Sequence, residues 1–352
     1  MKSIGELDAA LNVRDSFGRE DVALFDPREK PFTLYELIYE NGQYRRMPEQ
    51  VAATVSDGVR ELSAYTAGGR VAFRTDSDFV AISCRRPALW RMPHMALIAS
   101  AGFDLWTRED GVFRYAGSFM PNQNGDGYES LVKFETHKER EVLIHFPLYC
   151  PISSLLIGVQ TGANVSEWSG YSHQKPIVFY GSSITQGACA SIPGNDYIGR
   201  VSRHFNADYR NLGFSGNAKG EEAMMRYLAG LEMSAFVYDY DHNSPNAEHL
   251  QNTHERGYRI IREAHPDLPI VMMSCPNFDD PHRAAKPRRD VIAATYEKAL
   301  AEGDKHVAFI DGERVFATFV ADGCTVDGSH PNDLGFDRMA KEVIGALTPF
   351  FG

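Results

Sequence analysis

The feature that most constrains the fold is a regular alternation of apolar and helix-like segments after residue 175. The apolar segments are typical of strands buried on both faces, and they are PIVFYG (176–181), DYRNLGF (208–214), SAFVYDY (234–240), PIVMMSC (269–275) and HVAFID (306–311). Segments with helical spacing follow them near 195–206, 218–230, 246–265, 284–302 and 333–347. Alternating β and α units predict a doubly wound parallel sheet with right-handed crossovers.

The first half of the chain has a different pattern. Short β-rich stretches alternate there with turn residues, and long helical patterns are scarce. The stretches are 70–86, 94–110, 111–119, 140–150 and 153–162, whereas 49–65 favours neither helix nor strand. This pattern predicts an antiparallel β-sandwich or jelly roll. Because 352 residues exceed a typical single domain, we expect two domains, 1–170 and 171–352.

Polar residues and glycines cluster where the apolar segments of the second half end. The clusters are Gly181-Ser182-Ser183, NLGFSGN (211–217), YDYDHNSP (238–245) and, just before the last helical segment, TVDGSHPNDLGF (325–336). In an open parallel sheet, ligands bind beyond the carboxyl ends of the strands. The sequence therefore predicts one functional site made from these four stretches.

A Ser, a His and an Asp in these stretches have the chemistry of nucleophilic catalysis. A serine hydroxyl is a poor nucleophile until a base removes its proton, so Ser183 needs a partner such as the imidazole of His330. Asp327 precedes that histidine by three residues and can hold it in one tautomer. The backbone amides of Ser183 and Gly216 and the side-chain amide of Asn243 are suitable donors to an oxyanion.

Each stretch also has an ordinary structural interpretation when it is taken alone. Two serines at a strand-to-helix turn are typical of a helix N-cap, Gly-x-Ser-Gly is common in turns, and Asp-x-x-His can mark the start of a helix. We expect catalysis because all four stretches occur together at successive strand ends. On this interpretation Ser183 performs the chemistry and Ser182 shapes the turn.

The four stretches resemble the four sequence blocks of the SGNH, or GDSL, serine hydrolases, which are named for a Ser, a Gly, an Asn and a His from separate loops. The resemblance covers roughly residues 176–352 and implies a flavodoxin-like form of the doubly wound sheet. It implies Ser183 as the nucleophile, Gly216 and Asn243 as oxyanion-hole partners, His330 as the base and Asp327 as the acid.

A second resemblance lies in the first half. AGFDLW (101–106) is similar to the GxDLY signature of a β-domain that precedes some of these hydrolases, with Trp106 in place of Tyr. Ser182 is a further departure, since the family usually has Asp there, and it affects the geometry of the turn more than the identity of the nucleophile. For Gly102 and Asp104 we expect a turn glycine and an Asx hydrogen bond rather than substrate contact.

Asp239, Asp241 and His242 raise the alternative of a metal site. The two aspartates share one face of a strand while His242 points to the other, so this alternation disfavours a shared ion. We expect no metal, and the chemistry of Ser, His and Asp requires no organic cofactor. His242 and Ser182 are instead candidates for the substrate pocket.

The composition limits the partners. A formal net charge of −11 without a long Lys/Arg run disfavours nucleic acid and anionic membranes. No window approaches the roughly 20 apolar residues of a membrane-spanning helix, and the N-terminus lacks a signal-peptide pattern. Five scattered cysteines without CxxC indicate neither a zinc knuckle nor a disulfide framework. We expect a cytoplasmic protein, and the sequence is compatible with a homo-oligomer.

Together these observations predict a serine esterase that hydrolyses a small O-acyl ester through an acyl-enzyme. The expectation of an acetyl group on a carbohydrate comes from the family with a leading β-domain, so the expected partner is a small-molecule or oligosaccharide ester. An acyltransferase with the same residues, a lipase or arylesterase, and a non-catalytic glycan-binding protein are the alternatives. Trp90, Trp106 and Trp168 fit a core position as well as a sugar-binding platform.

Overall fold

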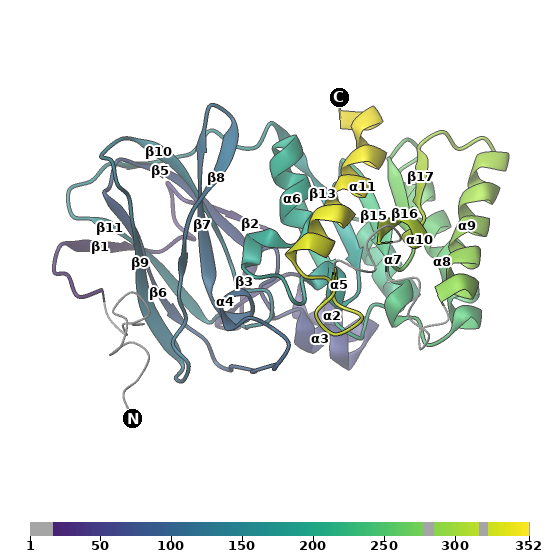
Figure 1. Cartoon of the computed structure of the whole chain (residues 1–352), viewed down its shortest axis with the longest axis horizontal. Helices are drawn as coiled ribbons and strands as arrows, with labels where there is room; N and C mark the ends of the chain where they lie inside the picture. The colour runs from purple at the N-terminus through teal and green to yellow at the C-terminus, as the bar shows by residue number, and fades with distance from the viewer. Residues whose placement is uncertain (1–16, 277–284, 317–322, 352) are drawn as a thin grey trace.

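The computed structural model describes residues 17–276, 285–316 and 323–351. An antiparallel β domain and an α/β domain lie side by side along the longest axis of the molecule (Figure 1). None of the helices within the described ranges has a stretch that is both long and apolar enough to cross a membrane.

A five-stranded parallel sheet forms the centre of the α/β domain. Its strands are β13 (His173–Gly181), β14 (Ala207–Gly213), β15 (Ala235–Asp239), β16 (Ile270–Met273) and β17 (Val307–Ile310). Their order across the sheet is β14-β13-β15-β16-β17. The chain therefore places β14 on one side of β13, and then adds β15, β16 and β17 in turn on the other side. This is the flavodoxin-like order, which confirms the predicted doubly wound fold.

Helices cover both faces of this sheet. They are α5 (Ser183–Gln186), α6 (Tyr197–Phe205), α7 (Glu222–Ala229), α8 (Ala247–Ala264), α9 (Ala285–Ala301), α10 (Gly312–Val315) and α11 (Asp333–Phe351). α6 packs against α11 on one face, while α7, α8 and α9 form a row on the other (Figure 1). Residues of β13 alternate between the layers, since Ile177 and Phe179 enter the first core and Val178 and Tyr180 the second.

The β domain consists of two antiparallel sheets packed face to face. Its strands are β1 (Val22–Phe25), β2 (Thr33–Tyr35), β5 (Arg70–Thr75), β6 (Phe79–Arg85), β7 (Phe103–Glu109), β8 (Val112–Phe119), β9 (Gly127–Lys133), β10 (Arg140–His145), β11 (Ser154–Gln160) and β12 (Val165–Ser166). One sheet has the order β1-β11-β6-β9, and the other has β12-β5-β10-β7-β8 with β2 paired to β5. Phe73 and Ile144 of one sheet meet Ile82 and Ile157 of the other in a shared core, which confirms the predicted sandwich.

The stretch 94–110, expected to be β-rich throughout, begins with a short helix. α4 (Leu97–Ala101) precedes β7, and Ala99 and Ala101 favour this helix because alanine has the highest intrinsic helix propensity. Gly102 ends it in an extended conformation, where a Cβ would lie 2.6 Å from the carbonyl oxygen of Ile98.

The stretch 49–65, whose pattern was ambiguous, is helical. It forms α2 (Glu49–Val55) and α3 (Asp57–Leu62) after a small hairpin of β3 (Ile38–Glu40) and β4 (Gln43–Arg45). The side chain of Ser56 caps α3 by accepting from the N–H of Val59 at 3.1 Å. α2 packs against α7, so this pair of helices reaches across to the α/β domain.

The aspartate of AGFDLW joins the two domains. Asp104 lies inside β7 and is fully buried. Its Oδ1 accepts from Nδ1 of His145 at 2.6 Å and from Nε1 of Trp106 at 3.1 Å, and its Oδ2 accepts from the backbone N–H of Gly194 at 2.6 Å. Gly194 belongs to a 3₁₀ turn just before α6. The Asx turn expected here is therefore wrong, because Asp104 is a strand residue whose bonds reach the other domain.

Candidate active site

The candidate nucleophile lies in a tight turn between β13 and α5. Ser182 is the N-cap of α5, and its Oγ accepts from the N–H two residues further on at 3.2 Å. The helix ends after four residues at Gly187, whose φ is 100°. Gly181 must be glycine, because a Cβ there would lie 2.1 Å from the carbonyl oxygen of Asp239. This turn leaves Ser183 half-buried at the first helical position.

Ser182 has a structural role in this turn. Its side chain is fully buried, so it offers no surface to a substrate. The structure therefore corrects the expectation that Ser182 lines the substrate pocket. The cap that it provides agrees with the other expectation, that this serine shapes the turn in which Ser183 lies.

The side chains of Ser183, His330 and Asp327 form a continuous hydrogen-bonded chain. Oγ of Ser183 lies 2.9 Å from Nε2 of His330, and Nδ1 of His330 lies 2.7 Å from Oδ2 of Asp327. Oδ1 of the same carboxylate accepts the backbone N–H groups of Ser329 and His330 at 3.0 and 2.8 Å. The aspartate thus holds both the ring and the backbone of the histidine, as an orienting acid does beside a base and its nucleophile.

The surroundings of Asp327 keep its carboxylate ionised. Partial burial raises its pKa, but the hydrogen bonds from the backbone and ring of His330 and from the N–H of Ser329 together outweigh that effect and lower the pKa to about 2. A carboxylate at neutral pH accepts the proton of Nδ1. Nε2 of His330 therefore presents its lone pair to the hydroxyl of Ser183.

The two predicted oxyanion residues lie on loops that are joined to each other and to α5. Gly216 is exposed and has a left-handed backbone with a φ of 69°. Asn243 accepts from the N–H of Ala218 at 3.4 Å through Oδ1, so its NH₂ end is the one that can donate to an oxyanion. The N–H of Ser215 donates to Oε1 of Gln186 at 3.0 Å, which ties the glycine loop to the helix of the nucleophile.

Asp239, Asp241 and His242, the residues considered as metal ligands, contact other side chains and backbone groups instead. Oδ2 of Asp239 accepts from Thr185 of α5 at 3.1 Å, and burial raises the pKa of this carboxyl well above its usual range. Oδ2 of Asp241 accepts from the N–H of Cys275 at 2.9 Å, while Nδ1 of His242 lies 3.7 Å from the sulfur of the same cysteine. Within the described residues these side chains form no cluster of metal ligands. His242 is half-buried beside Asn243, and its place in a substrate pocket remains a proposal.

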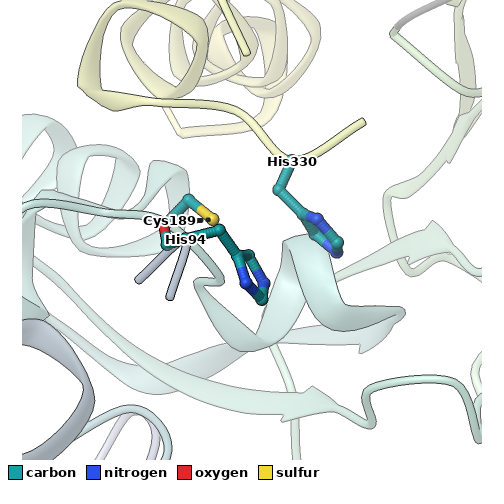
Figure 2. Close-up of side chains that lie close together, drawn as sticks. All are labelled: His94, Cys189 and His330. Carbon is teal, nitrogen blue, oxygen red and sulfur yellow. Dashed lines mark hydrogen bonds between the residues drawn. The ribbon is translucent and has the colours of Figure 1, made fainter. Parts of the chain in front are cut away.

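Two residues that the sequence did not single out lie next to His330 (Figure 2). The ring of His94, which comes from the β domain, has its centroid 5.6 Å from that of His330. Cys189 follows α5, and its thiol donates to the carbonyl oxygen of His94 at 3.4 Å. The metal-ligating atoms of the three side chains all lie within 4.8 Å of one another. No motif marked this group, because its members come from three distant segments.

The donors of this cluster are poorly suited to a resident metal ion. Both ring nitrogens of His330 already contact Ser183 and Asp327. Burial raises the pKa of the Cys189 thiol to about 12, whereas metals bind the thiolate. We therefore interpret His94 and Cys189 as part of the wall beside the base.

The β domain also contacts the helix of the nucleophile. The hydroxyl of Tyr149 donates to the carbonyl oxygen of Ser183 at 3.0 Å, and Nε2 of Gln186 donates to the carbonyl oxygen of Leu148 at 3.2 Å. Both partners lie in the segment that follows β10. The nucleophile is thus supported from the first domain as well as from its own sheet, which no pattern in the sequence indicated.

Two family models match the sequence. Residues 174–347 match the GDSL-like lipase/acylhydrolase family, and residues 23–165 match the GxDLY family, the N-terminus of SGNH-hydrolase-type esterases. Among curated proteins there is no significant match. The two matches follow one another along the chain as the β domain and the α/β domain do.

A solved structure extends this similarity over nearly the whole chain. A protein from Bacteroides ovatus ATCC 8483, described as a GDSL-like lipase, is 31% identical, with 94% of this chain and 98% of that chain covered and a TM-score of 0.83. The flavodoxin-like sheet and the polar loops at its carboxyl edge define the SGNH class of hydrolase. The chain belongs to the GDSL-like lipase/acylhydrolase family, as the resemblance of its four stretches implied.

More distant structures share the fold. A salicylyl-acyltransferase from a tetracycline biosynthetic pathway is 20% identical, with a TM-score of 0.78. A family two carbohydrate esterase from Cellvibrio japonicus is 10% identical, with a TM-score of 0.59. Each comparison covers 94% of this chain and 98% of the other. At these identities the similarity concerns the arrangement of both domains and not the reaction.

Proposed function

We propose that this protein is a serine esterase that hydrolyses small O-acyl esters. The substrate class that we propose first is a carbohydrate that carries an O-acetyl group. The observation that carries the proposal is the chain from Oγ of Ser183 to Nε2 of His330 at 2.9 Å and from Nδ1 of His330 to Asp327 at 2.7 Å. Membership of an acylhydrolase family supports the same reaction class.

Each residue of the site has a role in the proposed acyl-enzyme mechanism. His330 takes the proton of Ser183 as its oxygen attacks the ester carbonyl, and the amides of Ser183 and Gly216 with the NH₂ of Asn243 bind the oxyanion. The imidazolium then protonates the departing alcohol, which leaves an acyl-enzyme. A water molecule gives a proton to His330 and attacks this ester, and collapse of the second oxyanion releases the acid and returns the proton to Ser183. Asp327 stays ionised throughout and stabilises the imidazolium.

Two structural relatives support the choice of an acetylated carbohydrate. The carbohydrate esterase from Cellvibrio japonicus combines the same two domains, and an acetyl xylan esterase from Butyrivibrio proteoclasticus aligns over 93% of this chain with a TM-score of 0.56. Comparison of nitrophenyl esters of increasing acyl length tests the acyl group. A preference for long chains over acetate contradicts the proposed substrate and favours a lipase.

The decisive test replaces Ser183 with alanine. We expect Ser183→Ala to lower the rate of 4-nitrophenyl acetate hydrolysis by about 10⁴-fold or more, since the hydroxyl forms the covalent bond. Ser153→Ala is a matched control, because Ser153 is a half-buried serine of the β domain whose hydroxyl donates to the carbonyl oxygen of Arg85 at 3.2 Å. Equal rates for wild type and Ser183→Ala contradict catalysis and leave a glycan-binding protein as the alternative.

A second candidate function is acyl transfer to a sugar or metabolite alcohol. The observation that favours it is the close structural match to the salicylyl-acyltransferase, whose TM-score of 0.78 exceeds that of the carbohydrate esterases. The same triad serves either reaction, because an alcohol can replace water in the second step. Product analysis with and without added alcohols separates the two, since a transferase forms a new ester in preference to free acid.

A further inference from the structure

A groove of about 570 Å³ lies between α3 and the loop that follows β6. Its walls include Asp57 and Glu61 of α3, Tyr65 just after this helix, and Trp90 from the loop. Trp90 is 59% exposed, which is unusual for so large an aromatic side chain and makes it the most exposed of the large hydrophobic residues in the described chain. The roles proposed for Ser183, His330 and Asp327 do not account for this groove.

One aromatic contact connects Tyr65, in the wall of the groove, to the nucleophile. The ring centroids of Tyr65 and Tyr149 are 6.4 Å apart, and the hydroxyl of Tyr149 bonds to the carbonyl oxygen of Ser183 at 3.0 Å. Two aromatic side chains therefore separate the groove from the backbone of the nucleophile.

Two further contacts connect the walls of the groove to the active site. Gly58, the neighbour of Asp57, approaches Asn217 so closely that a Cβ would lie 2.0 Å from its Oδ1, and Asn217 follows the oxyanion glycine, Gly216. The loop that carries Trp90 continues to His94, which lies beside His330. The segments that form the walls of the groove therefore continue to residues beside the oxyanion loop and beside the base.

The charges of the groove disfavour an anionic ligand. Arg45 and Arg60 lie on its walls with three carboxylates, those of Glu49, Asp57 and Glu61. Glu49 lies 3.2 Å from Arg45 and 3.0 Å from Arg60, so both cations already have an anionic partner. One carboxylate is in excess, which disfavours phosphate, sulfate and carboxylate ligands.

The remaining chemistry matches a sugar. A pyranose has a flat face of C–H groups, which packs on an aromatic ring, and a rim of hydroxyls that donate and accept hydrogen bonds. The exposed ring of Trp90 supplies the flat apolar surface, and the carboxylates and guanidinium groups around it supply acceptors and donors. The arrangement is typical of ligand sites in which a few polar groups orient a molecule on an apolar surface.

From this geometry we propose that the groove binds the alcohol part of the substrate, as a neutral saccharide stacked on Trp90 with its ester group directed to Ser183. This inference rests on the proposed esterase function and adds to it a role for the β domain: α3 and the Trp90 loop select the carbohydrate, while the α/β domain performs the chemistry.

The test compares a sugar ester with an ester that has no sugar. The substrates are O-acetylated xylobiose, O-acetylated cellobiose and 4-nitrophenyl acetate, and the variants are Trp90→Ala, Trp90→Phe and the control Tyr115→Ala, which removes an aromatic that is 51% exposed on β8. For Trp90→Ala we expect the ratio of kcat/KM for the sugar ester to that for nitrophenyl acetate to fall about tenfold through KM. Trp90→Phe keeps part of the stacking face and loses less. The control keeps the wild-type ratio.

Several results overturn the groove as a saccharide site. These are an unchanged ratio in Trp90→Ala, an equal fall in the control, or no activity of the wild type on either sugar ester while nitrophenyl acetate is hydrolysed. Calorimetric titration of Ser183→Ala with the same acetylated disaccharides provides a test without turnover, in which adding Trp90→Ala must weaken binding about tenfold. A failure of the esterase proposal is recognised separately, because nitrophenyl acetate hydrolysis then does not depend on Ser183.

Discussion

Replacing Asp104 with Asn tests whether the junction of the two domains depends on a buried carboxylate. Asp104 is fully buried and accepts three hydrogen bonds, two on Oδ1 from the rings of His145 and Trp106 and one on Oδ2 from the N–H of Gly194. The asparagine has nearly the same shape but only one accepting oxygen. Whichever way its amide turns, an NH₂ group faces a donor.

The expected loss of stability follows from these three bonds. If the amide oxygen takes the place of Oδ1, the N–H of Gly194 loses its acceptor, and a buried unsatisfied donor costs about 1–3 kcal/mol. The two ring donors then bond to a neutral oxygen instead of a charged one, which removes roughly another 1 kcal/mol. We therefore expect the free energy of unfolding to fall by about 2–4 kcal/mol. For a chain of this size that corresponds to a decrease in Tm of roughly 3–5 °C.

Thermal unfolding followed by circular dichroism and by calorimetry measures this change. Asp110→Asn is the matched control, because Asp110 is exposed in the turn between β7 and β8, where its φ of 51° suits asparagine. A Tm for Asp104→Asn that equals that of the control refutes the argument that this carboxylate holds the 3₁₀ turn of Gly194. If the protein unfolds in two transitions and the Tm of only one of them decreases, the hydrogen bonds of Asp104 stabilise that domain alone.

Two other predictions concern single carboxylates. Asp327→Asn should lower kcat for nitrophenyl acetate by about 10²–10⁴-fold with little change in KM, because the amide no longer fixes the tautomer of His330; a kcat close to that of wild type means that the histidine is oriented by something else. Burial of Asp196, the N-cap of α6, raises the pKa of its carboxyl to about 7. Between about pH 4 and 7 the folded protein therefore holds a proton on this carboxyl that the unfolded chain lacks. The free energy of unfolding falls as pH rises through that window, by at most about 4 kcal/mol. Asp196→Asn keeps an acceptor for the N–H of Gly199 and should lose this slope, so urea unfolding at pH 5 and pH 8 should show the variant gaining stability relative to wild type at the higher pH; an equal difference at both values contradicts the assigned pKa.

The part of the fold that the sequence predicts well is the part with a strong period. Strands such as β13 are apolar on both faces because two helical layers cover them, and such runs stand out from the amphipathic helices between them. The polar strand ends were visible for the same reason, since each interrupts a buried run. Ser183, Asp327 and His330 could therefore be selected before the distances between them were known.

Contacts between the domains escaped this reasoning because they depend on residues with no local signal. The sequence AGFDLW suggested a turn, since Gly and Asp favour turns, whereas the burial of Asp104 is set by Gly194 in the other domain. His94 and Tyr149 reach the active site from loops of the β-sandwich, and although both lie in stretches predicted to be β-rich, no local pattern marks them as part of the site. Tertiary structure alone decides such positions.

The interface also explains how an exposed edge of the parallel sheet is protected. Among the strands of the described ranges β14 is an edge strand, and none of them pairs with its outward-facing backbone groups. Side chains of the β domain take that place. Arg70 donates to the carbonyl oxygen of Tyr209 at 3.0 Å, and Glu36 accepts from the N–H of Asn211 at 2.8 Å.

Arg46 completes this row of contacts. Its Nη1 donates to the carbonyl oxygens of Asn211 and Gly213 at 2.9 and 2.7 Å, and its guanidinium is almost completely buried. Without the β domain these backbone groups of β14 would be open to pairing with another chain. Since Gly213 leads directly into the loop of Gly216, the same arginine also fixes the start of the proposed oxyanion loop. The β domain is therefore a structural part of the catalytic unit, because removing it would expose a strand edge and release a loop of the active site together.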